Sequence, residues 1–399
     1  MGHQSVRSRE YHKNRHIGMV LRHIATKQGI SRIEIAKAMH LTKMAITNIV
    51  DDLIKNGYVV EKECIYSNLV GRRPMSLYVA PNAGKVMSVY LSRNELTALL
   101  SDLSGNILCK CSSVLENETS DTLSDKLFST IDKVFDYAKT HHSNSPILGI
   151  GVACIGPIDT ENGEILNPPD FFEITRFPVV SMLEQRYELS VYMNNDMNAS
   201  SLAENLFGVG RKHENFIYVG LTRGIGMGIV SNSELYQQGS GFAGEIGHIT
   251  IDYRGERCSC GNRGCLETYA NIPVILKRLS EASGEADVSV HDLQRLSVHP
   301  ACRRVLEDVT DKLAIALTNT INLLDPQCVV IGAEGAYLPD FCLEMLEREI
   351  NSHILAVGYR QVQVVRATFG SDTPLVGSAS CVLERIFNGH IPVCNSQSE

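Results

Sequence analysis

The chain has 399 residues, of which 44% are hydrophobic and 21% charged, and its formal net charge is −8. This composition is that of an ordinary globular protein, and the length predicts two or three domains. Residues 1–16 contain no apolar run of the signal-peptide kind, and no later stretch reaches ~18 uninterrupted apolar residues, so we expect neither secretion nor a membrane-spanning helix. We therefore expect a cytoplasmic protein, in which the twelve cysteines do not form a disulfide framework and clustered cysteines indicate metal binding or catalysis.

The charge is unevenly distributed along the chain. Residues 1–80 contain thirteen Lys and Arg and six Asp and Glu, a net charge of +7, whereas the remainder carries −15. A basic head on an acidic body indicates that the head alone binds a polyanion. The alternative is a basic segment that is merely solvated.

The first elements predict a winged helix-turn-helix. Residues 13–27 have the apolar spacing of a helix with one buried stripe. Ser31 and Glu34 have the spacing of a capping box for a second helix, and Thr42 can cap a third helix that Gly57 ends. Two short helices joined by a tight turn are typical of a helix-turn-helix, and residues 58–65 and 75–80 are expected to form the two strands of a wing.

The third helix is the candidate recognition helix, because its early outward side chains can reach base edges in the major groove. Two arginines in the wing loop can enter a minor groove or hold phosphates. The predicted DNA-binding residues are Ser31, Thr42, Lys43, Met44, Thr47, Asn48, Arg72 and Arg73. The alternative is a small helical module that binds another protein.

Strands and helices alternate from residue 85 onward, which predicts an α/β body. Three strands, a helix over residues 121–141 and a further strand form the first lobe. A long amphipathic helix over residues 303–324, ended by Asp325 and Pro326, and the buried strand that follows it indicate a second, similarly organised lobe.

Three cysteines lie close together in CSCGNRGCLE, residues 258–267. Cys258, Cys260 and Cys265, with His248 as a fourth ligand, form the sulfur and nitrogen set that Zn²⁺ favours, and four protein ligands leave no position for a catalytic water. The sequence therefore predicts a structural zinc site. A redox pair more often has C-x-x-C spacing, and free buried thiols are the remaining alternative.

The predicted metal site would position two carboxylates around one space, because Glu245 lies one turn before His248 and Glu267 lies two residues after Cys265. Upstream, a strand is expected to deliver Asn195 and Asp196 into the start of a helix. Carboxylates, an amide and an imidazole without a cationic cluster suit a neutral, polyhydroxylated ligand. Each residue also has a structural alternative, such as Asp196 acting as a helix cap.

These residues resemble the ROK family (repressors, open reading frames and sugar kinases), and specifically its repressor branch with an N-terminal winged helix-turn-helix. The most specific segments are GEIGH at residues 244–248, CSCGNRGCLE, and NND at residues 194–196. The resemblance implies an actin-like body of two lobes after the winged head. It gives domains over residues 1–82, over residues 83–197 with a helix at about 375–390 returning to them, and over residues 198–374.

The resemblance also assigns roles to single residues. The zinc ligands would be His248, Cys258, Cys260 and Cys265, and the sugar contacts would be Asn195, Asp196, Glu245, His248 and Glu267. In family kinases the aspartate at position 196 would be the general base. Here Tyr90–Asn94 replaces the D-x-G-x-T-like phosphate loop, Arg223 and Met227 interrupt the second glycine stretch, and Asp170 stands where an asparagine is frequent.

Because phosphoryl transfer depends on positioning and charge neutralisation, we expect Asp196 to be vestigial and the chain not to be an enzyme. The resulting hypothesis is a sugar-responsive repressor of carbohydrate genes that binds palindromic operator DNA as a homodimer or homotetramer. One alternative is a ROK-type sugar kinase with a fused DNA-binding head. Another is a repressor controlled by a sugar-transport phosphotransferase protein.

Overall fold

The computed structural model describes residues 2–63, 75–169, 171–237 and 242–391, with side chains from residue 12 onward. The chain divides into two compact units: unit 1 is Met1–Asn194 with Ser378–Glu399, and unit 2 is Asn195–Gly377. The three-domain division expected from the sequence stays a prediction. Within the described ranges, no helix combines the length and apolarity needed to cross a membrane.

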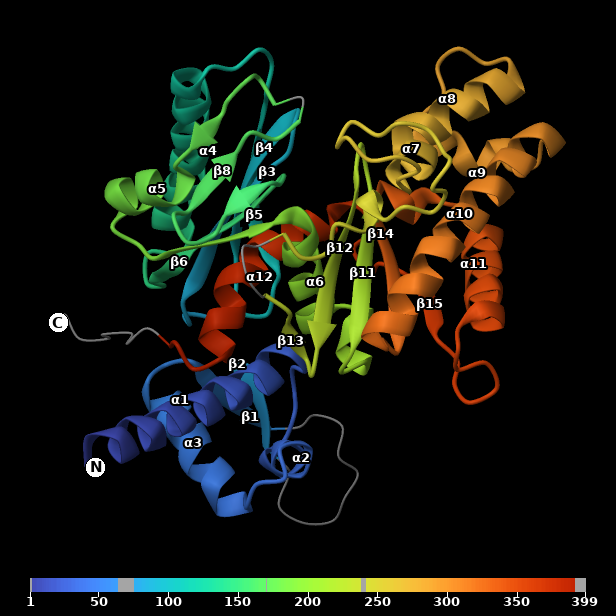
Figure 1. Cartoon of the computed structure of the whole chain (residues 1–399). Coiled ribbons are helices and arrows are strands. Elements are labelled where there is room, and N and C mark those ends of the chain that lie inside the picture. Colours follow the sequence, from blue (N-terminus) through green and yellow to red (C-terminus); the bar gives the residue numbers. More distant parts are fainter. Residues whose placement is uncertain (1, 64–74, 170, 238–241, 392–399) are drawn as a thin grey trace. The chain divides into compact units, whose positions relative to one another are not determined.

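The head is a winged helix, as predicted. It consists of α1 (Gly2–Thr26), α2 (Arg32–Ala38), α3 (Lys43–Lys55) and the antiparallel strands β1 (Val59–Glu63) and β2 (Met75–Val79) (Figure 1). Ser31 and Glu34 form the expected capping box of α2, and the Thr42 hydroxyl accepts the first free amide of α3, from Ala45. The wing loop, residues 64–74, lies outside the described residues.

Helix α1 begins at Gly2, eleven residues before the expected start at residue 13. The apolar stripe that predicted the helix begins only at Ile17, so the polar residues before it give no periodic signal. Val20, Leu21 and Ile24 on that stripe are fully buried.

Unit 1 contains a five-stranded sheet in the order β10-β6-β3-β4-β5. Strands β3, β4 and β5 are antiparallel neighbours, and β6 pairs parallel with β3. The sheet packs its apolar face against α4. The elements of this part of unit 1 are β3 (Lys85–Leu91), β4 (Glu95–Ser101), β5 (Ile107–Val114), α4 (Ser120–His141), β6 (Ile147–Cys154), β7 (Ile158–Asp159), β8 (Glu164–Leu166), β9 (Arg176–Phe177), α5 (Val179–Tyr187) and β10 (Val191–Asn195).

Unit 2 repeats this organisation with the sheet order β13-β12-β11-β14-β15. In both sheets the first strand is central, the next two follow on one side and the last two on the other, which confirms the predicted architectural repeat. The elements are α6 (Asp196–Phe207), β11 (Phe216–Leu221), β12 (Ile225–Ser231), β13 (Glu234–Leu235), α7 (Glu267–Ala270), α8 (Ile272–Ser283), α9 (Leu293–Leu296), α10 (Pro300–Leu324), β14 (Cys328–Ala333), α11 (Asp340–His353), β15 (Gln363–Arg366) and α12 (Thr373–Phe387).

A buried phenol ties four elements of unit 2 together. The hydroxyl of Tyr218, on the central strand β11, accepts a 2.8 Å hydrogen bond from the amide of Ala333, at the end of β14. Burial raises the pKa of Tyr218, and the neighbouring hydroxyls of Ser200 on α6 and Thr373 on α12 oppose this rise. Gly332 cannot carry a side chain, because its Cβ would lie 2.2 Å from the Tyr218 hydroxyl.

Helix α12 belongs to both units, since its residues up to Gly377 lie in unit 2 and those from Ser378 in unit 1. In unit 2, a Cβ on Gly377 would lie 2.4 Å from the Ala199 carbonyl oxygen, so α12 and α6 are in backbone contact. In unit 1, a Cβ on Gly18 would lie 2.4 Å from the Phe387 carbonyl oxygen, so the end of α12 contacts α1 of the head. One helix therefore touches both α6 and the head.

We predict that Tyr218→Phe lowers the free energy of unfolding by ~1–3 kcal/mol, because the buried Ala333 amide loses its acceptor. Urea unfolding followed by circular dichroism measures the change. The matched control is Tyr337→Phe, which removes a hydroxyl from a half-buried tyrosine and should change stability by less than about 0.5 kcal/mol. Equal effects of the two substitutions would contradict the role assigned to Tyr218.

Candidate functional site

The exposed face of α3 lies at its amino-terminal end, where a recognition helix contacts bases. Lys43, Met44 and Asn48 are exposed, and Met44 is 76% accessible although it is apolar. Thr47 is half-buried and donates its hydroxyl to the Lys43 carbonyl oxygen at 2.8 Å. The capping hydroxyls of Ser31 and Thr42 are engaged by the helix amides of Glu34 and Ala45. Arg72 and Arg73 lie outside the described residues.

Arg32 connects three elements of the head, a role that no local sequence pattern indicates. Its guanidinium contacts Asp51 at 2.8 Å and Glu61 at 2.9 Å, and donates to the Thr47 carbonyl oxygen at 3.3 Å. It therefore joins α2, α3 and β1 and compensates two acids. An uncompensated Asp51 on the recognition helix would oppose a phosphate backbone.

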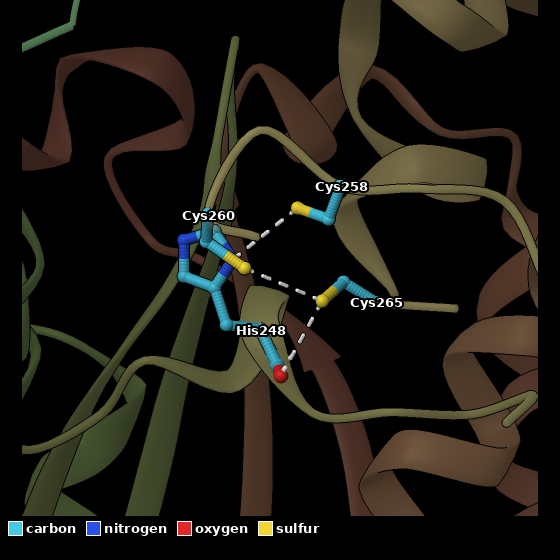
Figure 2. A group of neighbouring side chains, drawn as sticks. All are labelled: His248, Cys258, Cys260 and Cys265. Carbon is cyan, nitrogen blue, oxygen red and sulfur yellow. Dashed lines mark hydrogen bonds between the residues drawn. The ribbon is translucent and has the colours of Figure 1, made fainter. Parts of the chain in front are cut away.

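Figure 2 shows the predicted ligand set gathered at one point of unit 2. The ligand atoms of His248, Cys258, Cys260 and Cys265 all lie within 4.8 Å of one another. The Cys258 sulfur is 3.7 Å from His248 Nδ1, and the Cys260 and Cys265 sulfurs are 3.7 Å apart. His248 ends a short 3₁₀ helix, and the cysteines lie on the following loop.

Glycines let that loop fold so tightly. Gly261 and Gly264 have φ angles of +95° and +63°, which L-residues with side chains rarely adopt. At Gly264 a Cβ would also overlap the Asp252 carbonyl oxygen. The knuckle between Cys258 and Cys265 therefore depends on both glycines.

The separations fit a four-coordinate metal ion. For Zn–S of ~2.3 Å and Zn–N of ~2.0 Å, the S–N and S–S edges of a tetrahedron are about 3.5 and about 3.8 Å, and the separations of 3.7 Å between Cys258 and His248 and between Cys260 and Cys265 are close to these values. A disulfide would need sulfurs ~2.05 Å apart, and the ten cysteines among the described residues are free thiols. Burial raises the pKa of Cys265 to about 12, so a cation would be needed to hold this sulfur as a thiolate. The four residues can hold a metal ion.

Strand β12 supports the five predicted sugar contacts, all of which lie in unit 2. The Glu267 carboxylate accepts the Ile225 amide of β12 at 3.1 Å, and the loop before Glu245 is joined to β12 by the Met227 amide, 2.9 Å from the Gly244 carbonyl oxygen. On α6, Met197 fills the space above Gly226, so this helix packs directly on β12. A single strand therefore carries both carboxylate loops and the helix that begins with Asp196.

The Glu245 carboxylate lies in a partly desolvated environment. Desolvation by the surrounding protein raises the pKa of Glu245, nearby His248 partly opposes this rise, and the charge of Glu267 adds a smaller rise. The Glu245 side chain is nevertheless solvent-accessible, as a ligand contact must be. Asn195, and not Asp196, is the helix cap: its side-chain oxygen accepts the Asn198 amide at 2.8 Å.

The two turns that would meet nucleotide phosphates use their polar groups internally. Between β3 and β4 the Ser92 amide and hydroxyl both bind the Glu95 carbonyl oxygen, and the turn contains no glycine. Before β12 the Gly224 amide donates to the Thr222 hydroxyl, and the Ile225 amide donates to Glu267. In this turn both amides are therefore already hydrogen-bonded within the chain.

Glu204 is a further buried group that the sequence did not point to. Its carboxylate, 0% exposed on α6, accepts the amides of Thr368 and Val209 at 2.7 and 2.9 Å and the Thr368 hydroxyl at 2.8 Å. Desolvation raises the pKa of Glu204 despite these bonds. Its burial depends on the pairing with Thr368, which is distant in the sequence, so no local sequence pattern predicts it.

A winged helix followed by two similarly organised α/β lobes, with a thiol and imidazole cluster in the second, defines the class of protein. A family model described as "ROK family" matches residues 86–385, and one described as "MarR family" matches residues 16–63. The chain belongs to the ROK family, and the fold and family predicted from the sequence are confirmed.

Three known proteins place the chain within that family. A putative xylose repressor of Caldicellulosiruptor sp. (strain Rt8B.4) is 31% identical over 383 residues, covering 92% of this chain and 94% of the relative. The crystal structure of a ROK family transcriptional regulator, a homologue of the E. coli MLC protein, matches with a TM-score of 0.80 and 25% identity over 95% of this chain and 98% of its own. The ROK hexokinase of Thermus thermophilus matches with a TM-score of 0.64 and 25% identity over 74% of this chain and 97% of its own. The two matches that span nearly the whole chain are transcriptional regulators, whereas the body alone shares its fold with a kinase.

We predict that Cys260→Ser removes bound metal from the purified protein, because a hydroxyl replaces one of four ligands. Elemental analysis by mass spectrometry should find about one metal ion per wild-type chain and far less in the variant. Cys111→Ser is the matched control, since this half-buried thiol on β5 lies in unit 1. A metal-free wild-type protein would overturn the assignment.

Proposed function

We propose that this protein is a sugar-responsive, DNA-binding transcriptional repressor of carbohydrate genes. The observation that carries the proposal is the joining, in one chain, of a winged helix with an exposed recognition face to a ROK body. The basic excess of residues 1–80 supports DNA as the partner of the head. The free thiols are compatible with the cytoplasmic location expected for such a regulator.

We infer a neutral monosaccharide as the effector, with xylose as the first candidate because of the relative's name. Asn195, Asp196, Glu245, His248 and Glu267 would contact it. Carboxylates accept hydrogen bonds from sugar hydroxyls, and charge-assisted bonds of this kind contribute ~1.5–3 kcal/mol each. Their arrangement around β12 supports the assignment.

We propose Zn²⁺ as the resident metal, held by His248, Cys258, Cys260 and Cys265 in a closed, structural site. Bound there, it would neutralise the thiolates and fix the loop between Glu245 and Glu267. His248 Nδ1 faces the Cys258 sulfur. The imidazole can therefore serve the metal with one nitrogen and a ligand with the other.

Sugar kinase activity is the competing function, favoured by the hexokinase fold match and by the retention of Asp196. Against it stand the glycine-free turn after β3 and the consumption of the Gly224 and Ile225 amides by the chain itself. Phosphoryl transfer needs such donors to neutralise developing charge. We therefore infer that the nucleotide function has been lost.

Control of DNA binding would run through α12. This helix contacts α6, which begins with Asp196, and α1 of the head. A sugar that moves α6 would therefore move the helix that touches the head. Two heads are expected to bind a palindromic operator, so we propose a homodimer or homotetramer; a phosphotransferase protein as the controlling partner is the alternative.

The proposal is tested by presenting xylose, glucose and N-acetylglucosamine to the protein, with and without ATP and Mg²⁺. We expect one sugar to raise the melting temperature and release the protein from operator DNA, without forming sugar phosphate. Asp196→Asn should weaken the sugar response. Rapid ADP formation with any sugar would favour the kinase, and stabilisation by a transport protein alone would favour the partner-controlled repressor.

For the head, we predict that Asn48→Ala lowers the preference for operator over random DNA by ~1–3 kcal/mol, because a base-edge contact is lost. Arg73→Ala should instead weaken binding to both and reduce the slope of log K against log salt concentration by about one. Fluorescence anisotropy at several salt concentrations separates the two effects. Asn144→Ala, an exposed asparagine outside the head, is the control and should change neither.

A further inference from the structure

Five residues join the head to the first lobe, which is the part of unit 1 from β3 onward. We call residues 80–84 the linker. Ala80 and Ala83 in the linker are buried. The Ala80 amide donates to the Tyr58 carbonyl oxygen of the head at 2.9 Å, and the Ala83 amide donates to the Ala80 carbonyl oxygen at 3.0 Å. The linker is therefore hydrogen-bonded to the head at its start and is folded into a turn.

A buried lysine fastens the other end of the linker. Lys85, the first residue of β3, is 3% exposed, and its ammonium donates to the carbonyl oxygens of Pro81 and Ala83 at 2.9 and 3.0 Å. The Lys85 amide donates to the Pro146 carbonyl oxygen at 2.8 Å, directly before β6. Burial lowers the pKa of Lys85, and the charge of Asp102 opposes this fall. Because a buried lysine is rare unless its charge is compensated, these contacts indicate a specific role.

The turn between β4 and β5 holds the head at a second place. Gln28, which follows α1, donates its side-chain amide to the Ser104 hydroxyl of this turn at 2.5 Å. The Gln28 side-chain oxygen accepts the Val79 amide of β2 at 3.4 Å, so this residue also contacts the last strand of the head. Asp102 accepts the Ser104 amide at 2.8 Å and fixes the turn. The carboxylate whose charge acts on Lys85 therefore also orders the turn that Gln28 contacts.

The backbones of α1 and of the chain at the end of α12 cross at two glycines. A Cβ on Gly18 would lie 2.4 Å from the Phe387 carbonyl oxygen, and a Cβ on Gly389 would lie 2.6 Å from the Asn14 carbonyl carbon. Contacts this close leave no gap through which the two segments can shift. The head is therefore held by the linker, by Gln28 and by this crossing, which are three segments that lie far apart in the sequence.

We propose that Lys85 and Gln28 are positioning residues, which fix the orientation of the head on the first lobe so that the assembly selects one spacing between operator half-sites. This inference rests on the proposed function, because it concerns how two heads on one assembly meet palindromic DNA. In dimeric helix-turn-helix proteins the half-site spacing follows from the separation of the recognition helices. A fixed head accepts one spacing and loses little conformational freedom on binding, whereas a head on a loose tether accepts several spacings.

The first measurement follows hydrogen exchange of the linker in the full-length protein by mass spectrometry. We expect the Ala83 and Lys85 amides to be protected in the wild type and to exchange at least ~10-fold faster in Lys85→Met, which keeps the length of the side chain but removes the ammonium. Lys139→Met makes the same substitution at an exposed lysine of α4 and should leave this exchange unchanged. Linker amides that exchange in the wild type as fast as those of an unstructured peptide would overturn the fixed connection.

The second measurement uses a DNA fragment that the wild-type protein selects from a random pool, and derivatives with two base pairs inserted or removed between the half-sites. This change rotates one half-site by about 70° relative to the other. We expect the wild type to bind the derivatives at least ~10-fold more weakly than the selected fragment, and we expect Lys85→Met and Gln28→Ala to bring the ratio towards one. Binding to a fragment with a single half-site should not change. Fluorescence anisotropy measures all three affinities, with Lys139→Met and Gln294→Ala, an exposed glutamine of unit 2, as matched controls.

An unchanged ratio in folded Lys85→Met and Gln28→Ala would overturn the positioning role, as would an equal loss of binding to the single half-site, which indicates damage to the head itself. Melting curves identify a variant that does not fold, and Gln28→Ala alters only an exposed side chain. The proposed function is judged separately. A wild-type protein that selects no DNA would refute the repressor, while hydrogen exchange of the linker would still decide whether the connection is fixed.

Discussion

The surroundings of the buried Tyr218 hydroxyl are the constraint on which the arrangement of unit 2 depends. This phenol on β11 accepts a hydrogen bond from the Ala333 amide of β14 and lies beside the hydroxyls of Ser200 on α6 and Thr373 on α12. Burial makes each bond consequential, because an unpaired polar group there has no water to replace its partner. As a result α6, the start of α12 and the sheet meet at one buried side chain. Helix α12 continues from unit 2 into unit 1, where its end contacts α1.

Strand β12 imposes a second constraint, on the candidate sugar site. Gly226 and Gly228 bring α6 into close packing, while the Met227 and Ile225 amides hold the loops that carry Glu245 and Glu267. The cluster of His248, Cys258, Cys260 and Cys265 lies in the chain segment between these two carboxylates and brings the ends of that segment together. Candidate ligand contacts from three separate segments are thus held against one strand. Such convergence gives preorganised recognition, which limits the entropy lost on binding.

The sequence predicted the elements whose signals are local. The caps at Ser31, Glu34 and Thr42 and the cysteine spacing from 258 to 265 each depend on residues within a few positions of one another, and the structure has them as expected. The roles of Tyr218, Glu204 and Arg32 cannot be predicted from local sequence patterns, because their partners are distant in the chain. Glu204 and Thr368, for example, are separated by 164 residues. The sequence also does not distinguish Asn195 from Asp196 as the helix cap. The structure does so, because the Asn195 side-chain oxygen accepts the Asn198 amide. For the sugar contacts, only the resemblance to the ROK family assigns a role to each residue.

The proposed loss of nucleotide binding and the proposed sugar contacts can be explained by one energetic argument. A ligand can shift an equilibrium only by its difference in affinity for the two states, and a switch from mostly bound to mostly released needs ~3–5 kcal/mol. Two or three charge-assisted bonds from sugar hydroxyls to carboxylates, at ~1.5–3 kcal/mol each, can supply this difference if they form in one state only. An active kinase would phosphorylate the sugar and release it, so the sugar-bound conformation would be lost with each turnover. The hydrogen bond from the Ile225 amide fixes the Glu267 carboxylate, one of the proposed sugar contacts. Binding energy is then available to hold a conformation and is not spent on a reaction.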